Sequence, residues 1–265
     1  MGTTLTDWEG RSIKGAQSSR SKVFAAYDWR ELVLKPGPPI ETKSRVPSAR
    51  LYDFPPTEHS ALTARDGHYS DVQSIRSEDT VTWSAFGAYA SDDWIGELLG
   101  QSFGPANRPT AWARHYWKRL PHPDTGVTEH GPEADVTLEA EGGWFYAIEA
   151  KWLSDLPASQ GQKGTVTQLE MRSGSVVHRS SIPDRRGVLL VVPGPARYPH
   201  ATNATSTFRR YFAVSGSTYV PLATADVLSA RAVTWEQIEE MMSTTASLAT
   251  VATYLRWRLG FLPTE

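Results

Sequence analysis

The chain contains no cysteine among its 265 residues. This absence excludes disulfide bonds, zinc–thiolate centres and a cysteine nucleophile, and it fits the reducing cytoplasm. The sequence also lacks a long apolar run that could cross a bilayer, so we expect no membrane partner. Residues 1–15 lack the basic start and apolar stretch of a secretory signal. Together these absences lead us to expect a cytoplasmic protein.

The chain also lacks an excess of positive charge, because 27 Lys and Arg stand against 29 Asp and Glu. A protein that only coats nucleic acid is usually basic, so this balance argues against a pure DNA-binding module. It does not argue against a metal-dependent hydrolase, whose bound cation supplies positive charge. Hydrophobic residues make up 40% of the chain, which is enough for one sizeable core.

The sequence divides into three regions that together suit a single domain. Residues 1–75 are polar and contain proline clusters, and they predict an irregular N-terminal arm. Residues 76–200 alternate between helical and strand patterns and predict the core. Residues 201–265 predict a C-terminal extension packed on the core, with a strand over 209–214 and two helices. One of these helices begins after Thr234, and the other spans 247–259.

The core region predicts a regular order of elements. A helical segment begins near Ser77, its cap, and is expected to break into two helices near Ser91. A strand over 111–120, a hairpin over 134–152, a helix over 165–179 and a buried strand over 187–192 follow in this order. Such an order is typical of an α/β protein with a mixed central sheet flanked by helices.

The hairpin is the most informative segment, because apolar and polar residues alternate along both of its strands. The apolar faces of the two strands join only if Ala140 pairs with Trp144 across a three-residue turn. Gly143 then supplies the left-handed residue that such a turn needs. In this register Asp135 lies opposite Glu149, with Cβ atoms roughly 5 Å apart.

Two neighbouring carboxylates repel each other unless a positive charge neutralises them. Oxygen ligands and water suit a hard divalent cation such as Mg²⁺ or Mn²⁺. Lys151 follows Glu149 by two residues and lies on the same face of the strand as that carboxylate. A metal ion beside a lysine suits hydrolysis of a phosphodiester, because both groups stabilise negative charge that develops on the phosphate.

This arrangement resembles the PD-(D/E)XK nuclease superfamily, whose fold is restriction-endonuclease-like. Asp135 matches the first acid of the family motif, and Glu149–Lys151 matches its acid-x-lysine. The family proline directly precedes the first acid, whereas Pro132 stands three positions before Asp135. The resemblance covers about residues 77–193 and reaches neither end of the chain.

Two further residues resemble features of the same family. Glu78, early in the first helix, resembles an additional acid that many members contribute from a preceding helix. Gln168 resembles a glutamine that faces the site from the helix after the lysine strand. Arg172 follows one turn later, and we expect it on the surface rather than in the site.

The resemblance implies a Mg²⁺-dependent or Mn²⁺-dependent nuclease that acts in defence or repair, with DNA as the expected substrate and RNA as the second option. It implies that Asp135, Glu149, Glu78 and the carbonyl of Ala150 hold the metal. Lys151 activates or orients the attacking water in this interpretation, and Gln168 orients Lys151 or the nucleophile. The flanking regions then supply contacts to DNA, contacts between copies in a homo-oligomer, or both.

Three other interpretations of the same residues remain open at this stage. The charges could form an ion-pair cluster on a solvated face of the sheet, which contributes little energy. The chain could be a catalytically inactive nuclease-fold module that binds nucleic acid or a protein, in which case it binds no metal and Lys151 is dispensable. It could also be a glycoside hydrolase, which needs two carboxylates across a sugar cleft and neither the lysine nor a metal.

Overall fold

The computed structural model describes residues 4–6, 12–14, 78–87, 93–104, 108–156, 166–260 and 262. Its helices are α4 (Glu78–Phe86), α5 (Asp93–Phe103), α6 (Gln168–Arg179), α7 (Pro199–Thr202), α8 (Ala223–Val227), α9 (Trp235–Ser243) and α10 (Ala249–Leu259). The strands are β1 (Thr4–Thr6), β2 (Ser12–Lys14), β3 (Ala113–Arg119), β4 (Glu133–Ala140), β5 (Trp144–Ala150), β6 (Arg186–Val192), β7 (Phe212–Ser215), β8 (Thr218–Pro221) and β9 (Ala230–Thr234). Among these described elements, no helix combines the length and the apolar character that a membrane span requires.

A five-stranded mixed sheet forms the centre of the fold, with strand order β3-β4-β5-β6-β9. The pairs β3–β4 and β4–β5 are antiparallel, whereas the pairs β5–β6 and β6–β9 are parallel. Parallel strands are normally covered on both faces, and the continuous apolar sequence of β6 agrees with this. The expected α/β class with a mixed central sheet flanked by helices is therefore confirmed.

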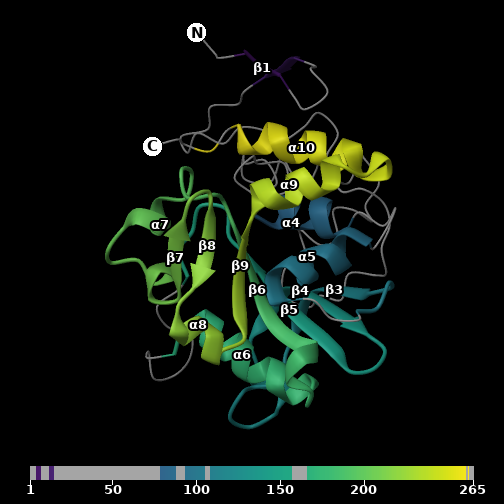
Figure 1. Cartoon of the computed structure of the whole chain (residues 1–265), viewed down its shortest axis with the longest axis vertical. Helices are drawn as coiled ribbons and strands as arrows, with labels where there is room; N and C mark the ends of the chain where they lie inside the picture. The colour runs from purple at the N-terminus through teal and green to yellow at the C-terminus, as the bar shows by residue number, and fades with distance from the viewer. Residues whose placement is uncertain are drawn as a thin grey trace, which may run out of the picture.

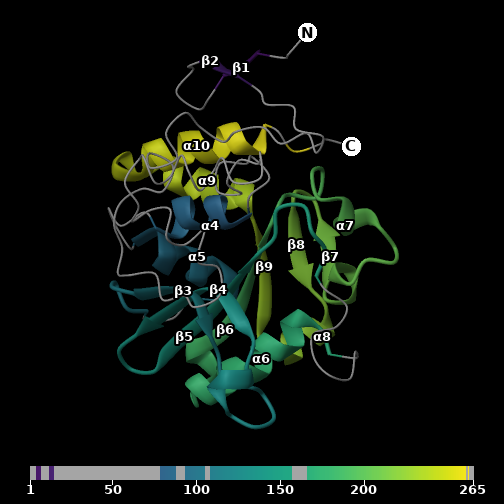
Figure 2. The ribbon, with the colours of Figure 1, turned by 180° about the vertical axis from the view of Figure 1, so that it is seen from behind.

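Helices and a small hairpin cover the two faces of this sheet (Figure 1). Helices α4, α5, α9 and α10 pack on one face with the apolar stripe that includes Val136 and Ile148. The other face carries a second core that includes Phe145 and Ala147, and α6 and the β7–β8 hairpin lie there, as the reverse view shows (Figure 2). Strand β5 is buried along its whole length because both faces of the sheet are covered.

The register of the β4–β5 hairpin is the one predicted from the sequence. Ala140 pairs with Trp144 and Val136 pairs with Ile148, so the apolar side chains of both strands share one core. Gly142 and Gly143 both have φ of +79°, a left-handed backbone conformation that glycine adopts without steric strain. The correct register follows from the alternation because a slip of one residue would turn every apolar side chain to the other face.

Two capping boxes define where helices begin. The Thr167 hydroxyl accepts from the Glu170 backbone N–H, and the Glu170 carboxylate accepts from the Thr167 backbone N–H, so α6 begins after Thr167. Thr234 and Gln237 make the same pair of bonds at the start of α9, as the sequence predicts. Each box satisfies two backbone donors that the first helical turn leaves free.

Other expectations for the ends of the chain have mixed outcomes. The strand expected over 209–214 is wrong in its first half, because Phe208–Arg210 form a 3-10 turn and β7 begins only at Phe212. The two C-terminal helices are confirmed as α9 and α10, and the expected break between two helices near Ser91 is confirmed by α4 and α5. The Ser77 cap and, apart from β1 and β2, the N-terminal arm lie outside the described residues.

Gly131 is expected to tolerate no side chain, because a Cβ at this position would lie 1.6 Å from the Leu120 carbonyl oxygen. That backbone cannot easily retreat, since the Leu120 N–H donates to the Pro132 carbonyl at 2.8 Å. We expect Gly131→Ala to lower the free energy of unfolding by roughly 3 kcal/mol or more. Gly96→Ala in α5 is the control: nothing lies within 4 Å of its Cβ, and alanine gains up to about 1 kcal/mol there. Urea unfolding of both variants checks this, and equal losses would contradict it.

Candidate active site at the carboxyl end of β5

The motif Glu149–Lys151 lies where β5 ends, beside the parallel strand β6. The Lys151 N–H donates to the Val191 carbonyl at 2.8 Å, so the lysine backbone is still joined to β6. Its carbonyl accepts from the Trp235 indole N–H at 3.1 Å. Two elements therefore hold the backbone of Lys151, which is the condition for a precisely positioned side chain.

The side chains of this motif are buried. Glu149 is 1% exposed and Lys151 is 5% exposed. Charged residues are almost never fully buried unless they are paired, because burial removes their hydration. The interpretation of these charges as an ion-pair cluster on a solvated face is therefore wrong.

The ammonium group of Lys151 contacts three oxygen atoms from three residues. It donates to Oε1 of Glu149 at 2.6 Å, to the carbonyl of Ala150 at 2.9 Å and to Oε1 of Glu78 at 3.3 Å. Glu78 is the first residue of α4, and this predicted additional acid does lie beside Lys151 and Glu149. The structure thus joins residues that are more than 70 positions apart in the sequence.

The second oxygen of Glu78 is held by the segment that follows the lysine. Oε2 accepts from the Trp152 N–H at 2.8 Å and from the Ser154 hydroxyl at 3.2 Å. The Ser154 carbonyl in turn accepts from the buried Tyr198 hydroxyl at 2.9 Å. These bonds fix the orientation of the Glu78 carboxylate, and the sequence contained no signal for Ser154 or Tyr198.

Asp135 lies beside the same strand end and is partly exposed. Its Oδ2 accepts from the Ala150 N–H at 2.8 Å. The β4–β5 pairing ends one step away, at Val136 opposite Ile148, and the Asp135 charge acts on Glu149. The contact with the backbone of Ala150 means that Asp135 and Glu149 flank the same peptide unit.

Arg172 belongs to the cluster, and the expectation that it lies on the surface is wrong. It is 3% exposed, its Nε contacts Oε2 of Glu149, and its Nη2 donates to the Glu133 carbonyl. Arg172 follows Gln168 by four residues, so both lie on the same face of α6. The four-residue spacing could have predicted the position of Arg172. If Gln168 faces the site, the residue one helical turn later faces it too.

Gln168 is the first residue of α6 and is 7% exposed. Within the described part of the chain, its side-chain carbonyl oxygen has no hydrogen-bond partner. A buried polar atom without a partner costs free energy, so such atoms often mark a place where a ligand or water binds. The expected role of Gln168 in orienting Lys151 or the nucleophile stays a prediction.

Burial and neighbouring charges shift the proton affinities of this cluster in definite directions. Burial raises the pKa of Glu149, and Arg172 opposes the shift. Burial also raises the pKa of Glu78 to about 7, with Lys151 opposing and Asp135 adding to the shift. Burial alone would lower the pKa of Lys151, but the three carboxylates raise it above its usual value. Lys151 is therefore an ammonium ion at neutral pH.

The oxygen atoms around Lys151 suit a divalent metal in their chemistry. Carboxylate and backbone carbonyl oxygens are the ligands that Mg²⁺ and Mn²⁺ prefer, and here they already hold a cation, the ammonium group. In the part of the chain that the structure describes, no three acidic or histidine side chains converge on one point as a ready-made metal site. The ammonium group contacts both Glu78 and Glu149.

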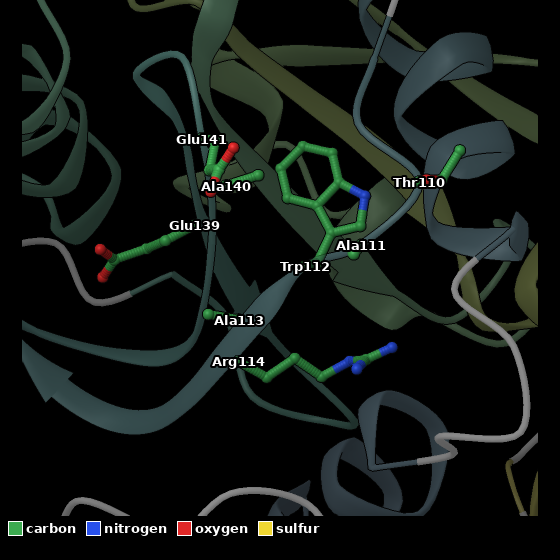
Figure 3. Close-up of a pocket in the computed structure, with 8 residues that line it drawn as sticks. All are labelled: Thr110, Ala111, Trp112, Ala113, Arg114, Glu139, Ala140 and Glu141. Carbon is green, nitrogen blue, oxygen red and sulfur yellow. The ribbon is translucent and has the colours of Figure 1, made fainter.

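A cavity of about 540 Å³ lies at the other end of β4, next to the turn of the hairpin (Figure 3). Residues 110–114 and 139–141 line it. Figure 3 shows the Trp112 ring at its centre, with the Glu139 carboxylate and the Arg114 guanidinium extending away in opposite directions. Glu139 is separated from Asp135 by roughly 13 Å of strand. This cavity is therefore separate from the cluster of Glu78, Asp135, Glu149 and Lys151, which we call the acid–lysine cluster.

The charge of Glu139 is expected to make stability depend on pH. Burial opposes its ionisation, but the bond from Lys118 at 2.5 Å and the charge of Arg179 lower its pKa below the usual value. A carboxyl group whose pKa is lowered by folding stabilises the fold above its unfolded pKa of about 4.3, and this contribution is lost as the pH falls through the folded pKa.

We expect Glu139→Gln to lower the free energy of unfolding by up to about 1 kcal/mol at neutral pH and by progressively less as the pH falls through the folded pKa. Urea unfolding of wild type and variant at a series of pH values from neutral to acidic measures the difference. A loss of the same size at every pH would contradict the assignment.

Comparison with protein-family models, with curated proteins and with solved structures found no match to this chain. The function must therefore be inferred from the geometry of the cluster itself.

Proposed function

We propose that this protein is a divalent-metal-dependent nuclease that hydrolyses phosphodiester bonds in DNA. The observation that carries the proposal is the buried contact of the Lys151 ammonium with Glu149 and with the Ala150 carbonyl. Asp135 binds the backbone of the same residue, Ala150, by accepting from its N–H. Placing the buried Glu149 beside two further carboxylates, Glu78 and Asp135, is costly, and an unfavourable arrangement of this kind is typical of a functional site.

The proposed metal ligands are Asp135, Glu149, Glu78 and the Ala150 carbonyl. A bound Mg²⁺ or Mn²⁺ would polarise the phosphate and lower the pKa of the attacking water. Lys151 stabilises the negative charge that develops on the phosphate or orients the water. Arg172 holds Oε2 of Glu149 and so positions that carboxylate.

The order of elements supports a restriction-endonuclease-like fold. A helix with an acid, a hairpin with the acid and acid-x-lysine, a helix with a glutamine and a buried parallel strand follow one another. This is the order expected of the PD-(D/E)XK superfamily, which the residues of the hairpin resemble. DNA is the proposed substrate on this resemblance, with defence or repair as the setting.

The second candidate is a catalytically inactive module of the same fold that binds nucleic acid or a protein. One observation favours it: Lys151 and Arg172 pair with Glu149, so the cluster is neutralised in part without any metal. A glycoside hydrolase has less support, because Glu149 is 1% exposed and paired with two cations instead of facing a sugar cleft.

Cleavage of supercoiled plasmid and of linear single-stranded DNA tests the proposal, each with Mg²⁺, Mn²⁺ or EDTA. We expect cleavage that requires the cation and disappears in Asp135→Asn. Glu97→Gln is the matched control, because it also converts an acid to its amide and Glu97 is exposed on α5. Absence of both metal binding and cleavage would favour the inactive module, and cleavage that persists in EDTA would refute the proposed chemistry.

A further inference from the structure

We propose that Lys151 is a built-in occupant of the cation position, and that a divalent cation enters the site by displacing its ammonium group. This inference rests on the proposed function, because it concerns how the same site takes up its metal. It goes further in assigning Lys151 two alternative positions, one before metal binding and one after.

The contacts of Lys151 are those of a bound cation. Three oxygens from Glu78, Glu149 and the Ala150 carbonyl surround its Nζ at 2.6 to 3.3 Å. All three belong to the proposed ligand set of the metal. A divalent cation bound by all three oxygens would lie close to the present position of the ammonium group, and the two positive charges would repel each other.

The charges of the cluster explain why an occupant is needed. Glu78, Asp135 and Glu149 carry three formal negative charges, and Lys151 and Arg172 carry two positive charges. Without Lys151, the buried Glu149 would keep only Arg172 as a cationic partner. Burial of carboxylates with so little compensation is strongly unfavourable. The lysine therefore lets the site fold before any metal is bound.

The two cations differ in how easily they can leave. Lys151 has a flexible four-carbon stem with a compact ammonium group, whereas the planar guanidinium of Arg172 also donates to the Glu133 and Gln168 carbonyls. Arg172 is thus anchored on α6 and β4, and Lys151 is held mainly by the oxygens that the metal would take. After displacement, the ammonium group is free to contact the phosphate. Metal binding would therefore place Lys151 for its proposed role of stabilising negative charge on that phosphate.

Calorimetric titration with Mn²⁺ tests the competition. We expect Lys151→Met to bind Mn²⁺ at least about tenfold more tightly than wild type, because the competing charge is gone. Lys118→Met is the matched control, since the Lys118 ammonium is also paired with a glutamate, Glu139, which stands four residues from Asp135 on β4. Its Mn²⁺ affinity should equal that of wild type. Equal or weaker binding by Lys151→Met would overturn the displacement.

Acetylation of wild type with an N-hydroxysuccinimide ester provides a test that needs no variant. Without metal, Lys151 is 5% exposed and its three oxygen partners keep it charged, so it should react slowly. At saturating Mn²⁺ we expect its acetylation rate, followed by peptide mass spectrometry, to rise several-fold while that of Lys118 stays constant. An unchanged rate at a Mn²⁺ concentration that saturates the calorimetric signal would overturn the displacement alone. Absence of Mn²⁺ binding in both wild type and Lys151→Met would instead refute the metal site and the proposed function.

Discussion

Lys151→Met is expected to reduce the rate of DNA cleavage by at least about 100-fold, which is the usual effect of removing one group that stabilises charge in a transition state. The same variant should bind Mn²⁺ more tightly than wild type. The opposite directions follow from the two positions of the lysine, which competes with the metal before binding and assists the reaction afterwards. The first-order rate of plasmid nicking at saturating Mg²⁺ measures the loss.

Lys118→Met is the control for this prediction, because Lys118 pairs with Glu139 outside the acid–lysine cluster. It should cleave at nearly the wild-type rate. If Lys151→Met folds, binds Mn²⁺ and still cleaves within about threefold of wild type, Lys151 takes no part in catalysis.

Arg172→Met is expected to lower the free energy of unfolding by about 3 to 5 kcal/mol, because it removes one partner of a buried ion pair. Glu149 is 1% exposed and would keep only the lysine as a charged partner. The change also leaves the Glu133 carbonyl without the donor from Arg172. Urea unfolding in the presence of EDTA measures this effect without a contribution from bound metal.

Arg256→Met is the control for that measurement. Arg256 pairs with Glu239 between α10 and α9, but its side chain is 66% exposed, so its loss should cost no more than about 1 kcal/mol. Combining Arg172→Met with Glu149→Gln should recover part of the stability, because the carboxylate is then no longer buried without its partner. Similar losses for Arg172→Met and Arg256→Met would contradict the assignment of Arg172 to the buried cluster.

The hairpin was predictable because three local patterns agree on one register. Alternation assigns each residue to a face, two glycines allow the turn, and the apolar faces join only when Ala140 pairs with Trp144. Asp135 and Glu149 are brought together by the same pairing. This part of the site is local in the sequence, so no long-range information was needed.

The remaining parts of the cluster depend on contacts between distant segments. In the sequence, Arg172 has the pattern of an ordinary charged residue on a helix. It contacts Glu149 only because α6 packs against the sheet. Tyr198 and Ser154 support Glu78 through a segment for which no strand or helix pattern was recognised. Alternation within a strand carries no information about such neighbours.

Strand β9 was missed for a related reason. Its five residues, Ala230–Thr234, form a short and only partly apolar sequence that resembles the loop before a helix. It becomes a strand because it pairs in parallel with β6, from Val188 opposite Ala230 to Val192 opposite Thr234. The capping box that follows was recognised because its two residues are only three positions apart.

A crystal grown or soaked with Mn²⁺ tests the central claim most directly, through the anomalous difference map. The account predicts a peak bound by Asp135, Glu149, Glu78 and the Ala150 carbonyl, with the Lys151 ammonium displaced from both glutamates. Lys151 still bridging Glu78 and Glu149 at saturating Mn²⁺, with no peak beside them, would contradict it.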